Sequence, residues 1–108
     1  MRKMGIVFLM LLLTIMGVVA ARAQEAASAD VAAKANAAYT AKNWTEAARL
    51  YEQLANAEPG NARYWYRLGV AAQSGGRLEK ALDAYEKALA TKQAPPVVEY
   101  NLACVMPR

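Results

Sequence analysis

Few side chains in this chain could do chemistry, and their types argue against a catalytic site. The chain has 108 residues with one cysteine, Cys104, and no histidine, so no imidazole base is present to activate a thiol or a hydroxyl. The usual zinc sites that contain histidine are excluded for the same reason. We therefore predict that the protein is not an enzyme and that it binds no metal ion or other cofactor.

The acidic residues have the spacing of a helix surface rather than of paired catalytic carboxylates. Asp83 and Lys87 lie four residues apart, which places opposite charges on one side of a helix. We predict solvated ion pairs along such surfaces. The acidic residues concerned are Glu46, Glu52, Glu79, Asp83 and Glu86, and the basic residues among them are Arg49, Lys80 and Lys87.

Cys104 lies between Ala103 and Val105 in an apolar run. A single cysteine cannot form an internal disulfide, and a free cysteine in such surroundings usually behaves as a small hydrophobic side chain. We predict that Cys104 is buried and has no redox role.

The N-terminal residues have the pattern of a secretory signal peptide. Two basic residues open the chain, an uncharged apolar run extends to about residue 21, and residues 21–23 read Ala-Arg-Ala. We predict a signal peptide at residues 1–23, cleavage after Ala23 and a short linker at residues 24–27. Export would place the protein in the periplasm or outside the cell. The alternative is an uncleaved anchor in the inner membrane, although a spanning helix needs about 20 apolar residues.

The charge of the mature chain argues against a nucleic-acid partner. Removing Arg2, Lys3 and Arg22 with the signal peptide lowers 13 basic residues to 10 against 9 acidic ones, a net charge of +1. Positive and negative residues are interspersed, whereas a phosphate-binding surface needs clustered Lys and Arg. We predict no nucleic-acid contact, and a membrane contact only through an uncleaved signal peptide.

From Val31 onward the sequence repeats itself at a fixed interval, which we call the repeat period and which is about 34 residues long. The aligned pairs include Val31 with Trp65, Ala47 with Ala81, Tyr51 with Tyr85, Glu52 with Glu86, Tyr66 with Tyr100 and Leu68 with Leu102. The third copy has only its beginning, so the chain holds about two and a half units.

Apolar residues within each unit have helical spacing, which predicts two helices per unit. Trp65, Leu68, Gly69 and Ala72 form one such series, and Leu78, Ala81, Leu82 and Tyr85 form the next. Breaks separate the helices at Lys42-Asn43 and Gly75-Gly76, and the units end at Pro59-Gly60-Asn61 and Pro95-Pro96. Asn43 and Glu46 have the spacing of a capping box.

Trp65, Leu68-Gly69, Ala81, Tyr85 and Ala88 follow one another as in the tetratricopeptide repeat, and the chain resembles that family. The first unit matches less well, because Val31 replaces the Trp and Lys34 the Leu. The resemblance implies an all-α fold in which helix-turn-helix repeats stack as a short right-handed α-solenoid. The repeats would span residues 28–61 and 62–95, with only the first helix of a third repeat at residues 96–108.

Small residues would let the helices of one unit approach closely, and large residues would fill the volume beside them. A glycine inside a helix costs about 1 kcal/mol relative to alanine, so Gly69 suggests close approach. The residues that we expect to pack the repeats are Ala47, Tyr51, Trp65, Leu68, Gly69, Ala72, Ala81, Tyr85 and Ala88.

The resemblance further implies a concave surface, lined by the first helix of each pair, that binds a protein or peptide partner. The residues at the corresponding positions are Asn36, Tyr39, Arg63, Tyr66, Arg67, Val70 and Asn101. The two asparagines would bond an extended peptide backbone, and Arg63 with Arg67 would receive a carboxylate. Ala32 stands where the carboxylate-clamping members of the family have a lysine, which argues against a clamp for a C-terminal carboxylate.

The predicted function is a non-catalytic interaction scaffold of the bacterial cell envelope. The alternative is an N-terminal module of a longer exported enzyme or assembly factor. The last helix bears on this choice, because Val98, Leu102, Val105 and Met106 have no partner helix in the sequence. This helix either caps the second pair, mediates self-association, or precedes further chain.

Overall fold

A computed structural model describes residues 27–106 of the chain. The predicted signal peptide and its cleavage site lie outside the described residues. The chain divides after Asp30 into two units, and the core belongs to the second, Val31–Arg108. Residues 27–40 are helical and form the first helix that the structure describes. The helices that follow are α2 (Trp44–Ala57), α3 (Ala62–Ser74), α4 (Leu78–Ala90) and α5 (Val97–Val105).

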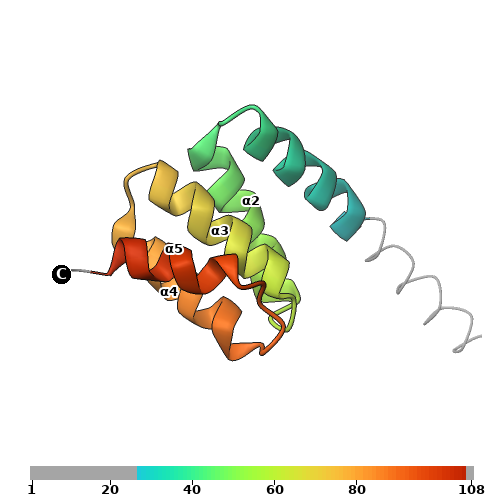
Figure 1. The fold of residues 1–108 in the computed structure, drawn as a ribbon. Helices are drawn as coiled ribbons and strands as arrows, with labels where there is room; N and C mark the ends of the chain where they lie inside the picture. Colours follow the sequence, from blue (N-terminus) through green and yellow to red (C-terminus); the bar gives the residue numbers. More distant parts are fainter. Residues whose placement is uncertain (1–26, 107–108) are drawn as a thin grey trace, which may run out of the picture. The chain divides into compact units, whose positions relative to one another are not determined.

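Consecutive helices fold back on one another and stack (Figure 1). α3 packs against α2 on one side and against α4 on the other, and α5 packs against α4. Residues 27–106 contain no strand. The predicted all-α stack of helix pairs is therefore confirmed.

The turns inside the two helix pairs have the same geometry, one repeat period apart. Lys42 and Gly76 both adopt a left-handed backbone, with φ of 60° and 80°. The next residue closes each turn, since Asn43 donates its N–H to the carbonyl of Ala38 at 2.9 Å and Arg77 does the same to Ala72 at 2.8 Å. Glycine suits this backbone, whereas Lys42 adopts it at a cost of about 1 kcal/mol.

The expected packing residues form one buried core. All nine are buried, and the largest side chains fully enclosed in it are Tyr51, Tyr85 and Val98. A Cβ atom placed on Gly69 would lie 2.9 Å from Cζ of Tyr85, so the ring of Tyr85 occupies the space that the missing side chain leaves. The indole N–H of Trp65 donates to the carbonyl of Pro59 at 2.8 Å, which ties the turn between α2 and α3 to the core.

One sequence expectation about apolar residues is wrong. The helical spacing predicts that Leu78 faces inward, but this side chain is 53% exposed. Its equivalent, Trp44, rests edge-on against Tyr39 with ring centroids 5.6 Å apart, whereas Gln73 replaces that tyrosine in the second pair. Val98 is fully buried because α5 packs on α4, which agrees with the alternative in which the last helix caps the second pair.

The rest of the last helix is only partly covered. Leu102 and Val105 pack partly buried against the core, and Met106 is 50% exposed. A groove of about 520 Å³ opens beside them, lined by Leu78, Glu79, Leu82 and Val105. Within residues 27–106, no helix has both the length and the apolar character needed to cross a membrane.

Candidate functional site

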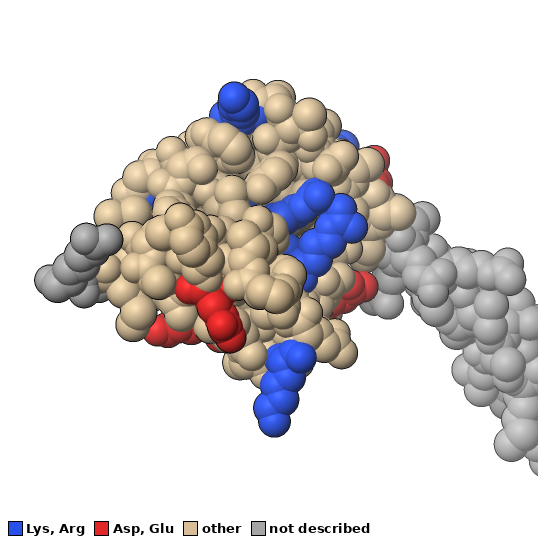
Figure 2. Space-filling view, viewed as in Figure 1, with Lys and Arg blue, Asp and Glu red and all other residues tan. Residues whose placement is uncertain are grey.

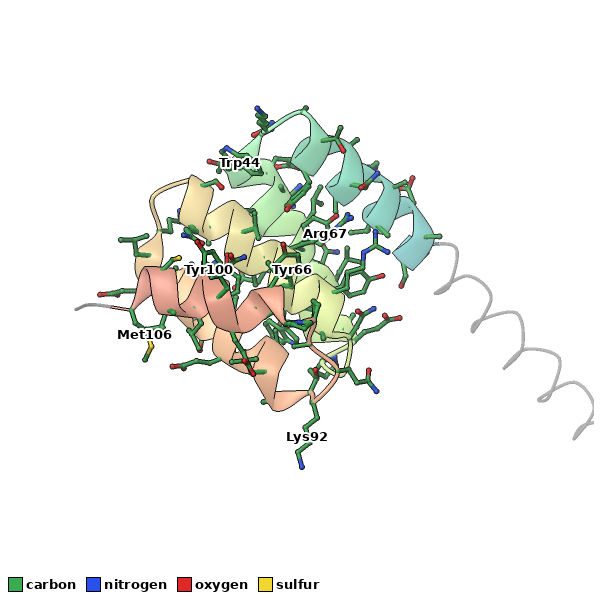
Figure 3. The ribbon with its side chains drawn as sticks, in the orientation of Figure 1. Trp44, Tyr66, Arg67, Lys92, Tyr100 and Met106 are labelled. Carbon is green, nitrogen blue, oxygen red and sulfur yellow. The ribbon has the colours of Figure 1, made fainter. Side chains whose placement is uncertain are left out.

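The residues expected on the concave surface come from three helical segments. Asn36 and Tyr39 belong to the first helix, Arg63, Tyr66, Arg67 and Val70 to α3, and Asn101 to α5. We call these seven residues, together with Tyr100 of α5, the inner face. Figure 3 shows Tyr66 and Arg67 on α3 and Tyr100 on α5. In the same view, Figure 2 shows basic side chains gathered near the middle of the molecule.

Arg67 is held in place by the neighbouring repeat. Its Nη1 donates to Oδ1 of Asn36 at 2.9 Å and to the hydroxyl of Tyr51 at 2.6 Å. Its guanidinium also lies over the ring of Tyr39, 5.1 Å from the centroid, where the cation is attracted to the ring. Arg67 therefore joins α3 to the first helix and α2, and its Nη1 is already committed within the protein.

Arg63 differs from Arg67 in its exposure. Its side chain is exposed. Its backbone N–H donates a hydrogen bond to Oδ1 of Asn61, the N-cap residue of α3, at 3.1 Å. Of the two arginines expected to receive a carboxylate, Arg63 is the one whose side chain faces solvent. Asn36 likewise has Oδ1 occupied by Arg67, which leaves its amide N–H groups as the part that can meet a partner.

The second repeat contains an equivalent of the Arg67 contact. Tyr85 and Asn101 stand one repeat period after Tyr51 and Arg67, and the side chain of Asn101 hydrogen-bonds to the Tyr85 hydroxyl. That hydroxyl donates in turn to Oε1 of Gln73 at 2.8 Å. In both repeats, the buried tyrosine of the second helix is thus joined to the same position on the next first helix.

Burial favours the protonated form of two tyrosines of this region, Tyr39 and Tyr85. It raises the pKa of Tyr85 far above its usual value, and the nearby Tyr66 adds to the rise while Asn101 opposes it. Burial also raises the pKa of Tyr39, with Tyr66 adding to it and Arg67 lowering it. Since both pKa values move away from neutrality, these hydroxyls remain hydrogen-bond donors at physiological pH.

The rings of the inner face are positioned by aromatic contacts. Tyr39 meets Tyr51 edge to face with centroids 5.9 Å apart, in addition to its contact with Trp44. The ring of Tyr66 lies 6.4 Å from that of Tyr85. These contacts hold Tyr39 and Tyr66 half-buried and orient them at the edge of the core.

Sequence reasoning missed two exposed residues of α5. Tyr100 is 70% exposed and stands one repeat period after Tyr66. Cys104 stands one period after Val70 and is exposed as well, so the prediction that it is buried is wrong. No described helix follows α5 to cover this side of it. The repeat period, applied to Tyr66 and Val70, is the signal that could have found these two positions.

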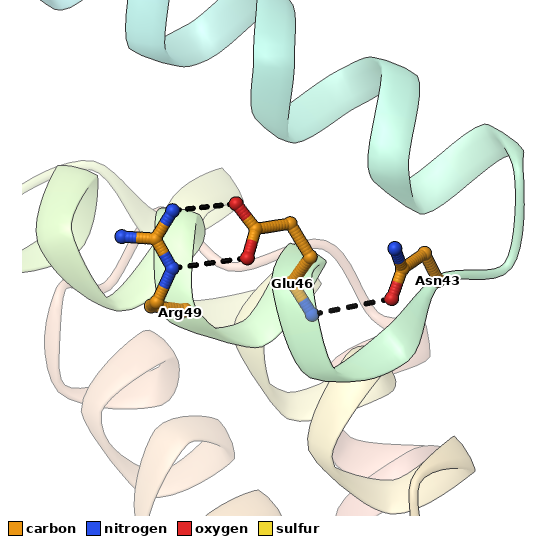
Figure 4. Close-up of polar contacts among 3 residues, drawn as sticks. All are labelled: Asn43, Glu46 and Arg49. Atoms are coloured by element: carbon orange, nitrogen blue, oxygen red, sulfur yellow. Dashed lines mark hydrogen bonds and ion pairs between the residues drawn. The ribbon is translucent and has the colours of Figure 1, made fainter.

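Three carboxylates of the second helices, those of Glu46, Glu52 and Asp83, are engaged in surface ion pairs. In α2, Asn43 accepts a hydrogen bond from the backbone N–H of Glu46 at 3.5 Å, as the capping-box spacing predicts. The carboxylate of Glu46 does not return to Asn43 but bonds Arg49, whose Nε lies 3.0 Å away (Figure 4). This bond lowers the pKa of Glu46. The reciprocal half of the predicted capping box is therefore absent.

Two further ion pairs agree with the predicted helix surfaces. Lys87 and Asp83 are 3.0 Å apart on α4, and Lys80 of α4 reaches Glu52 of α2 at 2.5 Å. The first pair confirms the expected contact at a spacing of four residues. Among residues 27–106, no three His, Cys, Asp or Glu side chains are grouped so that they could hold a metal ion.

A family comparison agrees with this arrangement of helices. The family described as "Tetratricopeptide repeat" matches residues 32–96 of the chain. The chain belongs to the tetratricopeptide-repeat family. A search of curated proteins found no match. Tetratricopeptide repeats are protein–protein interaction modules and are typically non-catalytic.

The first of these tetratricopeptide repeats departs from the family pattern at positions where its packing also differs. Ala35 is fully buried where the second repeat has Gly69, and Val31 packs partly buried against the core in place of Trp65. In this repeat Tyr51 meets the rings of Tyr39 and Tyr64.

Proposed function

We propose that this protein is an exported scaffold that binds a protein or peptide partner through its inner face. The observation that supports this most is the pinning of Arg67 by Asn36, Tyr51 and Tyr39, which holds two adjacent repeats in one geometry. A surface whose side chains are fixed before binding loses less conformational freedom when a partner arrives. Exposed Arg63 and Tyr100 supply the groups that contact the partner.

The charges of the described residues support a scaffold rather than a catalyst. The carboxylates of Glu46, Glu52 and Asp83 each lie against a basic side chain on the outer helices. None of the eight inner-face residues is acidic. The inner face therefore offers aromatic surface, amides and cations, which suit recognition of a polypeptide better than proton transfer.

Site-specific photocrosslinking in cells tests the proposed face. A photoreactive phenylalanine analogue at Arg63 is expected to give a discrete adduct with a partner, because this side chain is exposed on α3. Arg49, exposed on α2, is the matched control and is expected to give none. An adduct at position 49 and none at position 63 would show that the partner binds the second helices, and would refute the proposal.

Affinity capture with a variant that lacks the Arg63 charge measures how much this side chain contributes to partner binding. We expect Arg63→Ala to lower recovery of the crosslinked partner about tenfold, as for loss of one charged contact at an interface. Arg49→Ala should leave recovery unchanged, and Arg67 is not substituted because it also joins the repeats. Equal recovery with Arg63→Ala would show that this side chain does not contact the partner.

Export is tested by the N-terminus of the protein recovered from cells. Cleavage after Ala23 would leave Gln24 as the first residue, which N-terminal sequencing or intact mass detects. Ala23→Arg is expected to block processing and to leave the protein with the membrane fraction. Recovery of unprocessed wild-type chain in the membrane would instead support the alternative of an inner-membrane anchor.

A further inference from the structure

The last two helices carry an apolar groove that the inner face does not use. We propose that this groove, between α4 and α5, joins two copies of the chain into a symmetric dimer. The groove has a volume of about 520 Å³, we call it the end groove, and the residues that line it are Leu78, Glu79, Leu82 and Val105. The inference goes beyond the proposed function, because the end groove and the inner face share no residue.

In the first repeat, a helix lies at the equivalent of the end groove. Ala48 and Ala71 stand one repeat period before Leu82 and Val105, and both alanines are buried. There α4 packs on α3 and reaches α2 through an ion pair. In the described part of the chain, no helix follows α5 to do the same for α4 and α5. Leu82 and Val105 therefore stay half-buried, and they leave more apolar surface uncovered than alanines would.

The rim of the end groove carries exposed apolar side chains that fit a second end groove. Leu78 is 53% exposed, and Met106, the residue after Val105, is 50% exposed. Figure 3 shows Met106 at the C-terminal end of α5. In a pair related by a two-fold axis the same patch meets itself, so Leu78 and Met106 of each copy enter the end groove of the other. Methionine suits this position because its flexible side chain adapts to an irregular apolar surface.

Two opposite charges beside the end groove favour a second copy as its occupant. Arg77 and Glu79 flank Leu78 in the sequence, and both are exposed. Within residues 27–106, neither of these side chains takes part in an ion pair. A two-fold axis beside Leu78 brings Arg77 of one copy to Glu79 of the other, twice in the dimer. The patch is thus complementary to itself in charge as well as in shape.

The size of the patch predicts a weak dimer. Two such patches would bury about 1,000 Å² in total, which is at the lower end for specific interfaces, and we expect a Kd of about 10–100 μM. The dimer would present two inner faces. A partner with two binding segments would therefore be held more tightly by the dimer than by one copy.

Sedimentation equilibrium of the purified protein tests the inference, with dithiothreitol present so that Cys104 cannot link the copies. The apparent mass should rise with protein concentration toward twice that of one chain. Leu78→Glu should raise the Kd about tenfold or more, because it places a charge against the apolar groove. Val97→Glu is the matched control, since Val97 is also exposed but lies on α5 outside the end groove, and it should dimerise as the parent does. Both variants should keep the helical circular dichroism signal.

Charge reversal distinguishes a second copy from any other occupant. Arg77→Glu and Glu79→Arg should each weaken the dimer about tenfold, because like charges then face each other across the two-fold axis. An equimolar mixture of these two variants should dimerise within about threefold of the parent's Kd, because opposite charges meet again in the mixed pair.

Three results would each overturn the inference. They are a protein that stays monomeric up to about 1 mM, well above the expected Kd, equal dimerisation by Leu78→Glu, and a mixture that associates no more strongly than its two components. A monomeric protein would instead assign the end groove to a helix of another protein. Because the end groove lies outside the inner face, adducts at position 63 test the proposed scaffold function separately under every outcome.

Discussion

Ala81→Arg is expected to remove most of the protein's stability. Ala81 is fully buried on α4, in the helix that packs against α3 and α5. An arginine there adds a long side chain to a filled core and buries a charge without a partner, which together cost about 3–5 kcal/mol. A domain of this size has a total stability of about 5 kcal/mol. Thermal melting of the full chain, followed by circular dichroism, measures the loss.

Ala90→Arg is the matched control for this substitution. Ala90 is exposed at the last residue of the same helix, where a positive charge also suits the helix dipole. Its melting temperature should stay within a few degrees of the parent. If Ala81→Arg instead melts like the parent, Ala81 faces solvent and the register of the repeats is wrong throughout.

Gly69→Ala is expected to destabilise the protein by about 2 kcal/mol, although alanine is the better helix former by about 1 kcal/mol. The new methyl group would lie 2.5 Å from Cδ1 and 2.9 Å from Cζ of Tyr85. The ring has little room to move, because it is fully buried and its hydroxyl is bonded to Gln73. A loss of this size lowers the melting temperature of a small domain by about 10 °C.

A double-mutant cycle separates this contact from a general effect of the glycine. Tyr85→Leu removes the ring atoms, so Gly69→Ala should cost clearly less in that background than in the parent. Gly60→Ala is the control, because nothing lies within 4 Å of a Cβ at Gly60 and its stability should not fall. Equal costs of Gly69→Ala in both backgrounds would show that Tyr85 is not what Gly69 accommodates.

Much of the fold could be predicted because the repeat pattern reports on local packing. The small residues Gly69 and Ala81 suit a close helix contact, and the large residues Trp65 and Tyr85 fill the volume beside it. All four are buried. The breaks between helices were equally readable, since the Lys42 and Gly76 turns recur one period apart. Residue size and helical spacing determine packing between residues that are close along the chain, so their effect can be predicted from the sequence.

The sequence indicated which helices carry the candidate residues, but not how those residues bond within the protein. The seven expected residues lie on the first helices of the pairs, yet three of them, Asn36, Arg67 and Asn101, are bonded within the protein in ways that change their role. Arg67 was expected to bind a partner's carboxylate, but it also joins two repeats by bonding Asn36. Asn101 bonds the hydroxyl of Tyr85. Side-chain hydrogen bonds depend on which other groups the fold brings within about 3 Å.

The sequence by itself determined the period, the helix pairs, the turn positions and the identity of the packing residues, because each depends on neighbours along one or two helices. Only the tertiary structure decided that Leu78 and Cys104 are exposed and that Val98 is buried. It also decided that Arg67 bonds Asn36 and Tyr51, which are 31 and 16 residues away. Burial and polar contacts of this kind depend on which helix covers a given side, and that is set only when the repeats stack.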